Sequence, residues 1–230
     1  MGKKILVVVT SVERYPPDLV KRPTGLWLGE CVHFVKKVEE AGYEVDYVSP
    51  MGGYTPIDPH SLEMADDTDW EWYGNKPFMA RLGAVKTPAQ VSAADYAAIY
   101  YTGGHGTVWD FPDNKELQAL ARSIYEAGGY VTSVCHGACA LLNIALSDGA
   151  SLISGKRVTG FSNEEEKQVQ LDKYMPFLTE DELKARGATY EKASDAWAPF
   201  ALSDARVITG QNPASGGAVA ETLLKELGGK

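Results

Sequence analysis

The sequence predicts an α/β protein in which helices cover both faces of an open, mostly parallel β-sheet. Residues 4–10 form a nearly unbroken apolar run, which is typical of a parallel strand buried on both faces. After this run, strand-like and helix-like segments alternate along most of the chain. With 230 residues, the chain is long enough to form one domain with a full hydrophobic core, and we expect a single domain over residues 1–230.

The predicted elements follow from local patterns. The first helix is expected from about Gly25, with Thr24 as its N-cap and Gly42 just past its end. Further strands are predicted from apolar or alternating segments at residues 43–48, 96–102, 130–134, 157–160, 197–202 and 207–210. Further helices are predicted at residues 115–127, 137–146, 164–173 and 215–227. Residues 51–92 interrupt the alternation and are rich in proline, glycine and acidic residues, so we interpret them as an insertion.

The composition is that of a globular protein that does not bind nucleic acid. The 22 basic and 31 acidic residues give a formal net charge of −9, and no cluster of basic residues offers a surface for phosphates. The longest aliphatic run, residues 5–9, is too short to span a bilayer or to act as a signal peptide. The three cysteines form an odd set without metal-ligand spacing, so we expect reduced thiols in a cytoplasmic protein with no membrane partner.

Cys135 lies where a predicted strand meets a predicted helix. The small residues Ser133 and Gly137 flank it two positions before and two positions after, which is the pattern of a nucleophile elbow. Such a turn places the nucleophile at the carboxyl edge of the sheet and at a helix N-terminus. There the helix dipole would favour the thiolate, and free backbone N–H groups would stabilise an oxyanion. The alternative is a buried cysteine that only fills space, which is the role we expect for Cys139.

A glycine-rich turn, Gly103-Gly104-His105-Gly106, follows another predicted strand and should reach the same edge of the sheet. The Gly104 N–H is a candidate second oxyanion donor, and His105 is a candidate substrate-binding residue. A turn that merely requires positive φ is the alternative. No third glycine falls at the spacing of a dinucleotide site, which argues against such a site, and the absence of Gly-Lys-Ser/Thr excludes a P-loop.

Glu30 lies in the first predicted helix, in an apolar column with Leu26, Trp27 and Phe34. Burial of a carboxylate is costly and raises its pKa. A buried Glu30 within about 5 Å of the Cys135 sulfur could share one proton with the thiol and act as a coupled acid–base unit. The alternative is an ordinary surface glutamate on an amphipathic helix.

His136 directly follows the candidate nucleophile. It can assist Cys135 only if the elbow turns both side chains toward one cleft, with a carboxylate from residues 164–166 behind the imidazole. His105 is the rival histidine, and a solvated helix face is the alternative role for residues 164–166. Because no histidine follows His136, glutamine amidotransfer, which uses a later catalytic histidine, is excluded. The sequence shows no tight cluster of His, Asp and Glu, so we predict no metal.

Several of these motifs resemble the ThiJ/PfpI superfamily. They are the elbow at Cys135, the turn at residues 103–106, Glu30 after Thr24-Gly25, the segment at residues 51–61, Gly160-Phe161-Ser162 followed by Glu166, and the segment at residues 209–215. The resemblance covers nearly the whole chain. It is strongest to the branch that contains heat-inducible chaperones and glutathione-independent glyoxalase III enzymes.

The resemblance implies a flavodoxin-like three-layer sandwich, often a homodimer. It also implies that Cys135, His136 and Glu166 form a triad and that Glu30 is the acid–base partner. Enzymes of this branch convert methylglyoxal, a 2-oxoaldehyde, to D-lactate without a cofactor, through a cysteine hemithioacetal whose oxyanion would rest on the N–H groups of Gly104 and His136. This activity, D-lactate dehydratase in the lyase class, serves methylglyoxal detoxification in the stress response.

Three other functions remain open from the sequence. A holdase chaperone would use an apolar patch in the insertion, such as Trp70, Trp72, Tyr73 and Phe78, although a dimer interface or a pocket lid would explain these residues equally well. A small cysteine hydrolase or peptidase would use the same nucleophile. A redox sensor would need an exposed thiol of low pKa.

Overall fold

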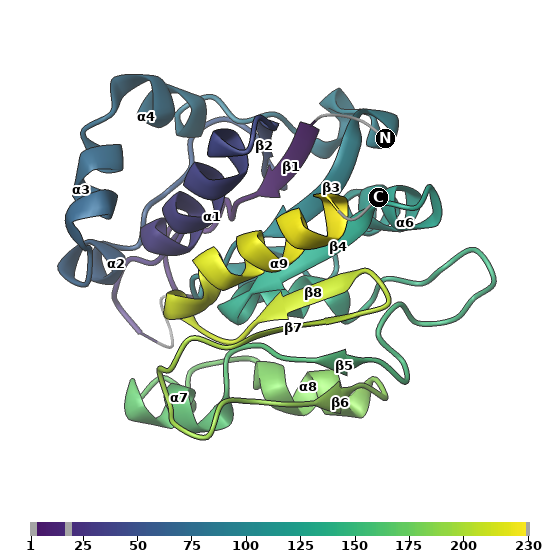
Figure 1. Cartoon of the computed structure of the whole chain (residues 1–230). Coiled ribbons are helices and arrows are strands. Elements are labelled where there is room, and N and C mark those ends of the chain that lie inside the picture. Colours follow the sequence, from purple (N-terminus) through teal and green to yellow (C-terminus); the bar gives the residue numbers. More distant parts are fainter. Residues whose placement is uncertain (1–3, 17–19, 229–230) are drawn as a thin grey trace.

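A six-stranded sheet runs through the centre of the computed structural model, which describes residues 4–16 and 20–228 (Figure 1). The strand order is β2-β1-β3-β4-β8-β7, and β7 is antiparallel to β8 whereas the other neighbouring pairs are parallel. The strands are β1 (Lys4–Val8), β2 (Glu44–Val48), β3 (Tyr96–Tyr101), β4 (Tyr130–Val134), β7 (Ala201–Asp204) and β8 (Val207–Gly210). The predicted fold class, a mostly parallel α/β sheet, is confirmed.

Helices cover both faces of this sheet because successive residues of β1 point to opposite sides. Ile5 and Val7 belong to a core shared with α1 (Leu28–Glu40) and α9 (Gly216–Gly228), which lie side by side. Leu6 and Val8 belong to a second core shared with α6 (Lys115–Glu126). Burial on both faces explains why β1 has no polar positions after Lys4. Within the described part of the chain, none of the helices is both long enough and apolar enough to cross a membrane.

The segment at residues 51–92 contains three short helices, α2 (Pro59–Glu63), α3 (Asp67–Tyr73) and α4 (Lys76–Leu82). Each begins at a side chain that accepts a hydrogen bond from its first turn: Asp58, Asp66 and Asn75. Helix α3 packs against both α1 and α4, so this segment lies beside the first helix of the sandwich.

The aromatic patch predicted in this segment is partly wrong. Phe78 is buried in the core between the rings of Tyr47 and Trp72. Trp70 and Tyr73 remain exposed and contact each other edge to face. Helical spacing on α3 and α4 separates these residues onto different faces, which a run of aromatic letters does not reveal.

Between β4 and β7 the chain forms a small excursion beside the main sheet. Strand β5 (Arg157–Val158) pairs in parallel with β6 (Thr189–Tyr190) in a separate sheet. Helices α7 (Asn163–Gln168) and α8 (Thr179–Ala185) lie between them in the sequence. The sequence patterns missed β6 and α8 and extended α7 too far. Helix α7 ends early because Gln170 adopts a φ of 60°, which a continuing helix does not allow.

Two predicted boundaries are also wrong. Helix α1 begins at Leu28 rather than Gly25, and Thr24 is not its N-cap: the Thr24 hydroxyl donates to the Asp58 carboxylate over 3.0 Å. Strand β7 begins at Ala201 because Trp197 has a φ of 67°, which is incompatible with an extended strand.

Candidate active site

Cys135 lies at the sharp turn that follows β4. It is the first residue of a 3₁₀-helix, Cys135–Leu141, which replaces the α-helix predicted at residues 137–146. Its φ is 56°, an unfavourable value for a residue with a side chain and one found at nucleophile elbows. The turn requires a glycine two positions later, because a Cβ on Gly137 would lie 2.4 Å from the Thr102 carbonyl oxygen. The elbow geometry expected from the sequence is therefore present. Cys139 lies in the core, as expected.

Glu30 is fully buried on α1 and faces the same place. Its Oε2 accepts a hydrogen bond from the Gly103 N–H over 2.7 Å. A Cβ on Gly103 would lie 2.3 Å from this oxygen and 2.8 Å from the Cys135 Cβ, so the two side chains flank the glycine closely. Its Oε1 is buried without a hydrogen-bond partner of ordinary geometry among the described residues. Burial raises the pKa of Glu30 to about 8, although the Cys135 thiol and the Gly103 N–H oppose this effect.

The pKa of the Cys135 thiol is shifted in the direction opposite to the one predicted from the sequence. Burial, and then the negative charge of Glu30, raise the pKa of Cys135 well above its ordinary value, and the His136 N–H only partly opposes them. The prediction that the helix N-terminus favours the thiolate is therefore wrong for the resting site. A short 3₁₀-helix offers little dipole, and burial outweighs it.

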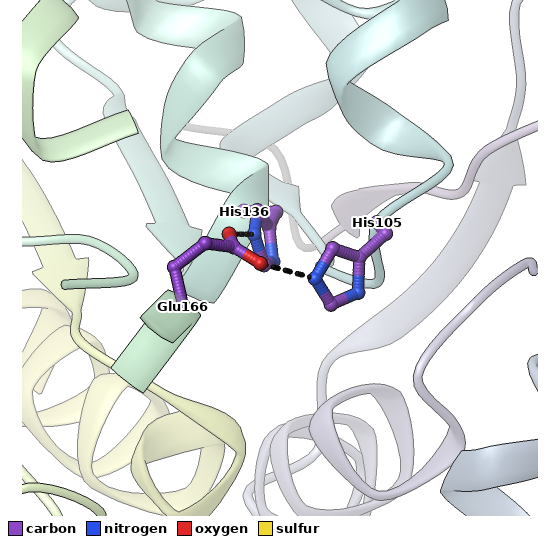
Figure 2. A group of neighbouring side chains, drawn as sticks. All are labelled: His105, His136 and Glu166. Atoms are coloured by element: carbon purple, nitrogen blue, oxygen red, sulfur yellow. Dashed lines mark hydrogen bonds and ion pairs between the residues drawn. The ribbon is translucent and has the colours of Figure 1, made fainter. Parts of the chain in front are cut away.

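His136 connects the cysteine to an acid, as the elbow turns both side chains toward one cleft. Its Nδ1 lies 3.4 Å from the Cys135 sulfur, and its Nε2 lies 2.6 Å from Glu166 Oε2. Figure 2 shows that the other oxygen of Glu166 contacts His105 Nε2, over 2.8 Å. One carboxylate thus orients both rings, and the two histidines that rivalled each other in the sequence belong to one cluster.

The charges in this cluster depend on one another. Burial alone would raise the pKa of Glu166, but attraction to and hydrogen bonds from His136 and His105 hold it well below its usual range. Burial, reinforced by the neighbouring His136, lowers the pKa of His105. Glu166 is therefore the negative member, and because it accepts a hydrogen bond from the Nε2–H of His136, the His136 Nδ1 is free to act as a base toward the thiol.

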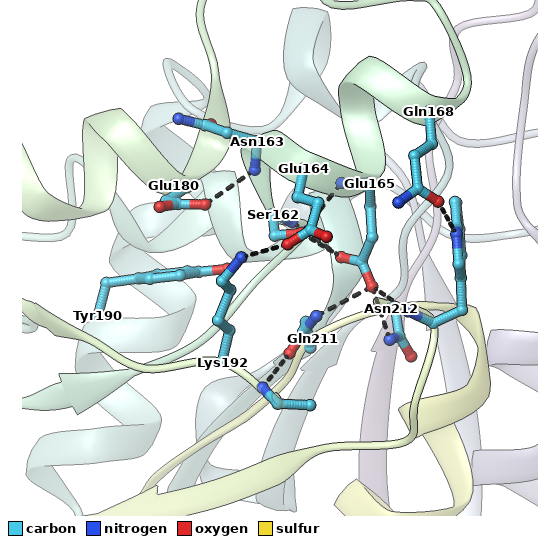
Figure 3. A network of polar contacts seen from close by, with 12 residues as sticks. Ser162, Asn163, Glu164, Glu165, Gln168, Glu180, Tyr190, Lys192, Gln211 and Asn212 are labelled. Atoms are coloured by element: carbon cyan, nitrogen blue, oxygen red, sulfur yellow. Dashed lines mark hydrogen bonds and ion pairs between the residues drawn. The ribbon is translucent and has the colours of Figure 1, made fainter. Parts of the chain in front are cut away.

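The three consecutive glutamates, Glu164 to Glu166, have three different environments, which the sequence could not separate. Glu164 pairs with Lys192 at the surface. Glu165 is fully buried and accepts five hydrogen bonds from neutral groups (Figure 3). The donors are Ser162 N and Oγ, Trp197 N, Gln211 Nε2 and Asn212 Nδ2. One signal in the sequence could have identified the role of Glu165, namely the spacing Ser162-x-x-Glu165. This spacing is a capping box that begins α7 and thereby sets the position of Glu166.

Gly104 lies beside the elbow, as expected of an oxyanion donor. Its φ is 104°, and a Cβ there would lie 2.1 Å from the Gly25 carbonyl oxygen, so this position requires glycine. The neighbouring Gly103 N–H is already bound to Glu30, whereas no hydrogen bond among the described residues uses the Gly104 N–H. The His136 N–H faces the Cys135 sulfur, and Gly104 lines the same cavity.

A cavity of about 540 Å³ opens above these residues. Gly104, His105, Cys135 and His136 line one end of it, at the elbow. Its apolar wall includes Trp27, Met64, Phe161, Val169, Trp197 and Pro213. A further wall is polar and includes His33, His60, Asp66 and Asp69. The cavity can therefore admit a small carbonyl compound to the sulfur.

The structure forms two donor clusters that the sequence did not reveal. His105, His136 and Glu166 offer ligand atoms within 4.8 Å of one another, and so do His33, Asp66 and Asp69. The prediction from the sequence that His, Asp and Glu form no tight cluster is therefore wrong. The pattern was missed because the residues of each cluster come from segments that lie far apart in the sequence. In the first cluster the contacts with Glu166 already give each ring a partner.

The fold and this site define an α/β protein with a cysteine at a nucleophile elbow, next to a buried glutamate and a His–Glu pair. The chain belongs to the DJ-1/PfpI family, whose model matches residues 28–226. The resemblance to the ThiJ/PfpI superfamily is confirmed.

Two curated relatives that align with most of the chain are named as glyoxalases. The chain is 35% identical over 224 residues to the glutathione-independent glyoxalase HSP31 of Saccharomyces cerevisiae. This alignment covers 93% of each chain. It is 32% identical over 233 residues to glyoxalase 3 of Candida albicans, covering 96% of this chain and 97% of that one.

Two solved structures have the same fold as this chain over nearly its whole length. Glyoxalase III from Candida albicans has a TM-score of 0.88 at 30% identity and 96% coverage of both chains. The 24 kDa rapid encystment protein of Francisella tularensis has a TM-score of 0.93 at 36% identity and 99% coverage of both chains.

Proposed function

We propose that this chain is a glutathione-independent glyoxalase that converts methylglyoxal and similar 2-oxoaldehydes to 2-hydroxy acids such as D-lactate. The observation that supports this most is the buried Glu30 beside Cys135, because it provides an acid–base group with a pKa of about 8 next to a nucleophile. The glyoxalase names of relatives that align over most of the chain support the same reaction class.

The first step is addition of the sulfur to the aldehyde carbon. His136 Nδ1, 3.4 Å from the sulfur, accepts the thiol proton as the S–C bond forms. The aldehyde oxygen becomes an oxyanion that the N–H groups of Gly104 and His136 stabilise, and His136 returns the proton to it. The product is a hemithioacetal on Cys135.

The second step moves hydrogen between the two carbons of the substrate. Glu30 removes the proton from the hemithioacetal carbon through its Oε1, which gives an enediolate, and then returns this proton to the neighbouring carbon. The hydroxyl proton of the hemithioacetal passes to the former ketone oxygen. The hemithioacetal carbon thereby becomes a thioester and the ketone becomes an alcohol. Water then cleaves the thioester, releasing the 2-hydroxy acid and restoring the thiol. The overall reaction adds one water and needs no external oxidant, so we propose that no cofactor takes part.

The test is D-lactate formation from methylglyoxal, without glutathione, by the wild type and the Cys135→Ala and Glu30→Gln variants. We expect turnover by the wild type and a loss of at least a thousandfold in each of these variants. Cys139→Ala is the matched control, since this buried cysteine packs against Thr107 in the core and should retain activity. Unchanged turnover in Cys135→Ala would refute the proposal, and cleavage of peptides by the wild type without D-lactate formation would favour the hydrolase.

We further propose that the protein is a cytoplasmic homodimer that acts in the stress response. The reduced, buried state of the cysteines and the HSP31 relative support this proposal. Light scattering of the purified protein tests the dimer, and cell fractionation tests the compartment.

A further inference from the structure

The polar wall of the cavity has no role in the proposed reaction. It consists of His33 on α1 and of Asp66 and Asp69 at the start of α3, and it faces the same space as Cys135. A substrate as small as methylglyoxal, bound at the sulfur, would fill only a small part of a cavity of about 540 Å³. This wall is therefore available to another ligand.

Three donor atoms converge here. His33 Nε2 lies 3.2 Å from Asp66 Oδ2 and 3.3 Å from Asp69 Oδ1. The Asp69 side chain is only 7% exposed, and among the described residues its Oδ1 has only the ion-pair contact with His33, which lacks the geometry of a hydrogen bond. A buried carboxylate oxygen with so poor a partner is costly, so a positively charged ligand at this point would reduce an existing penalty.

The backbone fixes these donors before any ligand binds. Asp66 and Asp69 form the reciprocal capping box of α3, in which each side chain accepts a bond from the other residue's N–H. Gly29 on α1 leaves room for the carboxylate, because a Cβ there would lie 2.9 Å from Asp69 Oδ2. His33 follows one turn later on the same helix. Two elements therefore hold the donors in place.

We propose that His33, Asp66 and Asp69 form a binding site for one divalent transition-metal cation, such as Zn²⁺ or Co²⁺. One imidazole and two carboxylates are a suitable donor set for such ions. Separations of 3.2 and 3.3 Å between donors are those expected around a cation with bonds of about 2.0 to 2.2 Å. The half-exposed Asp66 leaves a path from solvent.

The site has a structural consequence because it joins two helices. A cation held by His33 from α1 and by the two aspartates from α3 would tie the segment at residues 51–92 to the sandwich. Binding to the folded chain would then raise its melting temperature. Its open positions would face the cavity, where water would complete the coordination.

The test is a titration of the metal-free, full-length chain with Zn²⁺ and Co²⁺ by calorimetry and Co²⁺ absorption. It uses a Cys135→Ala, His136→Ala background, which removes competing donors at the elbow end of the cavity. We expect one cation per chain and a rise in melting temperature. Adding His33→Gln or Asp69→Asn should weaken binding at least tenfold and remove the rise; Asp69→Asn keeps a side-chain oxygen for the cap of α3.

His60→Gln is the matched control, because His60 lines the same cavity outside the cluster and should leave binding unchanged. No uptake at millimolar cation, with the wild-type wall intact, would overturn the proposal and leave a protonated His33 between two carboxylates. Binding that persists unchanged in both cluster variants would overturn it as well. The readout is binding rather than turnover, so it stands apart from the proposed glyoxalase activity.

Discussion

Replacing Glu165 by alanine, with Glu164→Ala as its matched neighbour, tests how the acid of the catalytic cluster is held. Figure 3 shows that Glu165 joins α7 to the segment around Asn212, and Glu165 also accepts a hydrogen bond from the Trp197 N–H. Oε1 accepts three hydrogen bonds, each over 2.9 Å, and Oε2 accepts two from Ser162. Within the described part of the chain no cation forms an ion pair with Glu165, so five neutral donors are the direct partners of this fully buried carboxylate.

The expected loss of stability follows from these contacts. Hydrogen bonds to a charged group contribute about 1.5 to 3 kcal/mol each, but their losses are not additive because the donors relax and water enters. Removing one partner of a buried polar network costs about 3 to 5 kcal/mol. In a chain of this size, this corresponds to a fall in melting temperature of roughly 6 to 20 °C. Glu164 makes one exposed ion pair with Lys192, so its removal should cost less than about 1 kcal/mol.

Urea denaturation followed by tryptophan fluorescence measures both free energies of unfolding, and the activity assay is run in parallel. Glu165→Ala should also lose turnover, because the helix that places Glu166 loses its anchor. The reasoning is refuted if the two variants lose equal stability, or if Glu165→Ala loses less than about 1 kcal/mol.

Three further predictions concern the site. First, the pKa of Glu30 is about 8 in the folded chain against an ordinary 4.5, so the folded state keeps this proton longer than the unfolded state. The stability of the wild type relative to Glu30→Gln should be highest below pH 4.5 and fall by about 4 to 5 kcal/mol as pH rises through 8. A difference between the two that does not change with pH in urea denaturation would contradict this. Second, Gly103→Ala should lose at least a hundredfold in turnover with its circular dichroism unchanged, because its Cβ would lie 2.3 Å from Glu30 Oε2. Gly228→Ala, with open space around its Cβ, is the control. Third, His105→Ala should lower kcat less than His136→Ala, because His105 contacts Glu166 and the His136 ring, whereas His136 itself contacts the sulfur; equal losses would give His105 a direct role.

The fold was predictable where a local pattern decides the structure. Burial on both faces leaves β1 apolar at every position from Ile5 to Val8, and this signal needs no knowledge of its neighbours. The elbow was predictable for a similar reason, since crowding at Gly137 excludes any larger side chain. By contrast, β6 forms by pairing with β5 across the small excursion, and the start of β7 depends on the positive φ of Trp197. Neither feature produces a periodic pattern of apolar residues in the sequence.

The catalytic cluster was only partly predictable. The capping-box spacing Ser162-x-x-Glu165 distinguishes Glu165 from Glu166, but it does not show which of them contacts the histidines, because their other partners lie 30 to 61 residues away in the chain. The same holds for His33, which meets its aspartates only when α3 packs against α1. Charged residues in such runs look solvated, and only the tertiary structure shows which of them are buried.

The pKa of Cys135 is shifted upward rather than downward as predicted, and the cause of this difference is physical. The elbow motif suggests a thiolate because it places sulfur at a helix N-terminus, yet burial and the Glu30 charge raise the pKa instead. Protonation of Glu30 removes that charge and turns the carboxyl group into a hydrogen-bond donor toward the sulfur. The thiol and the carboxyl therefore titrate as one coupled pair, in which the proton on one group makes ionisation of the other easier. A site of this kind keeps an unreactive thiol at rest and forms the nucleophile only as the substrate accepts its proton. It follows that Glu30→Gln, which removes the charge but keeps a donor, should make Cys135 react faster with iodoacetamide above pH 8, where Glu30 of the wild type is ionised, even though turnover is lost. Slower labelling in this variant would show that Glu30 activates the resting thiol instead.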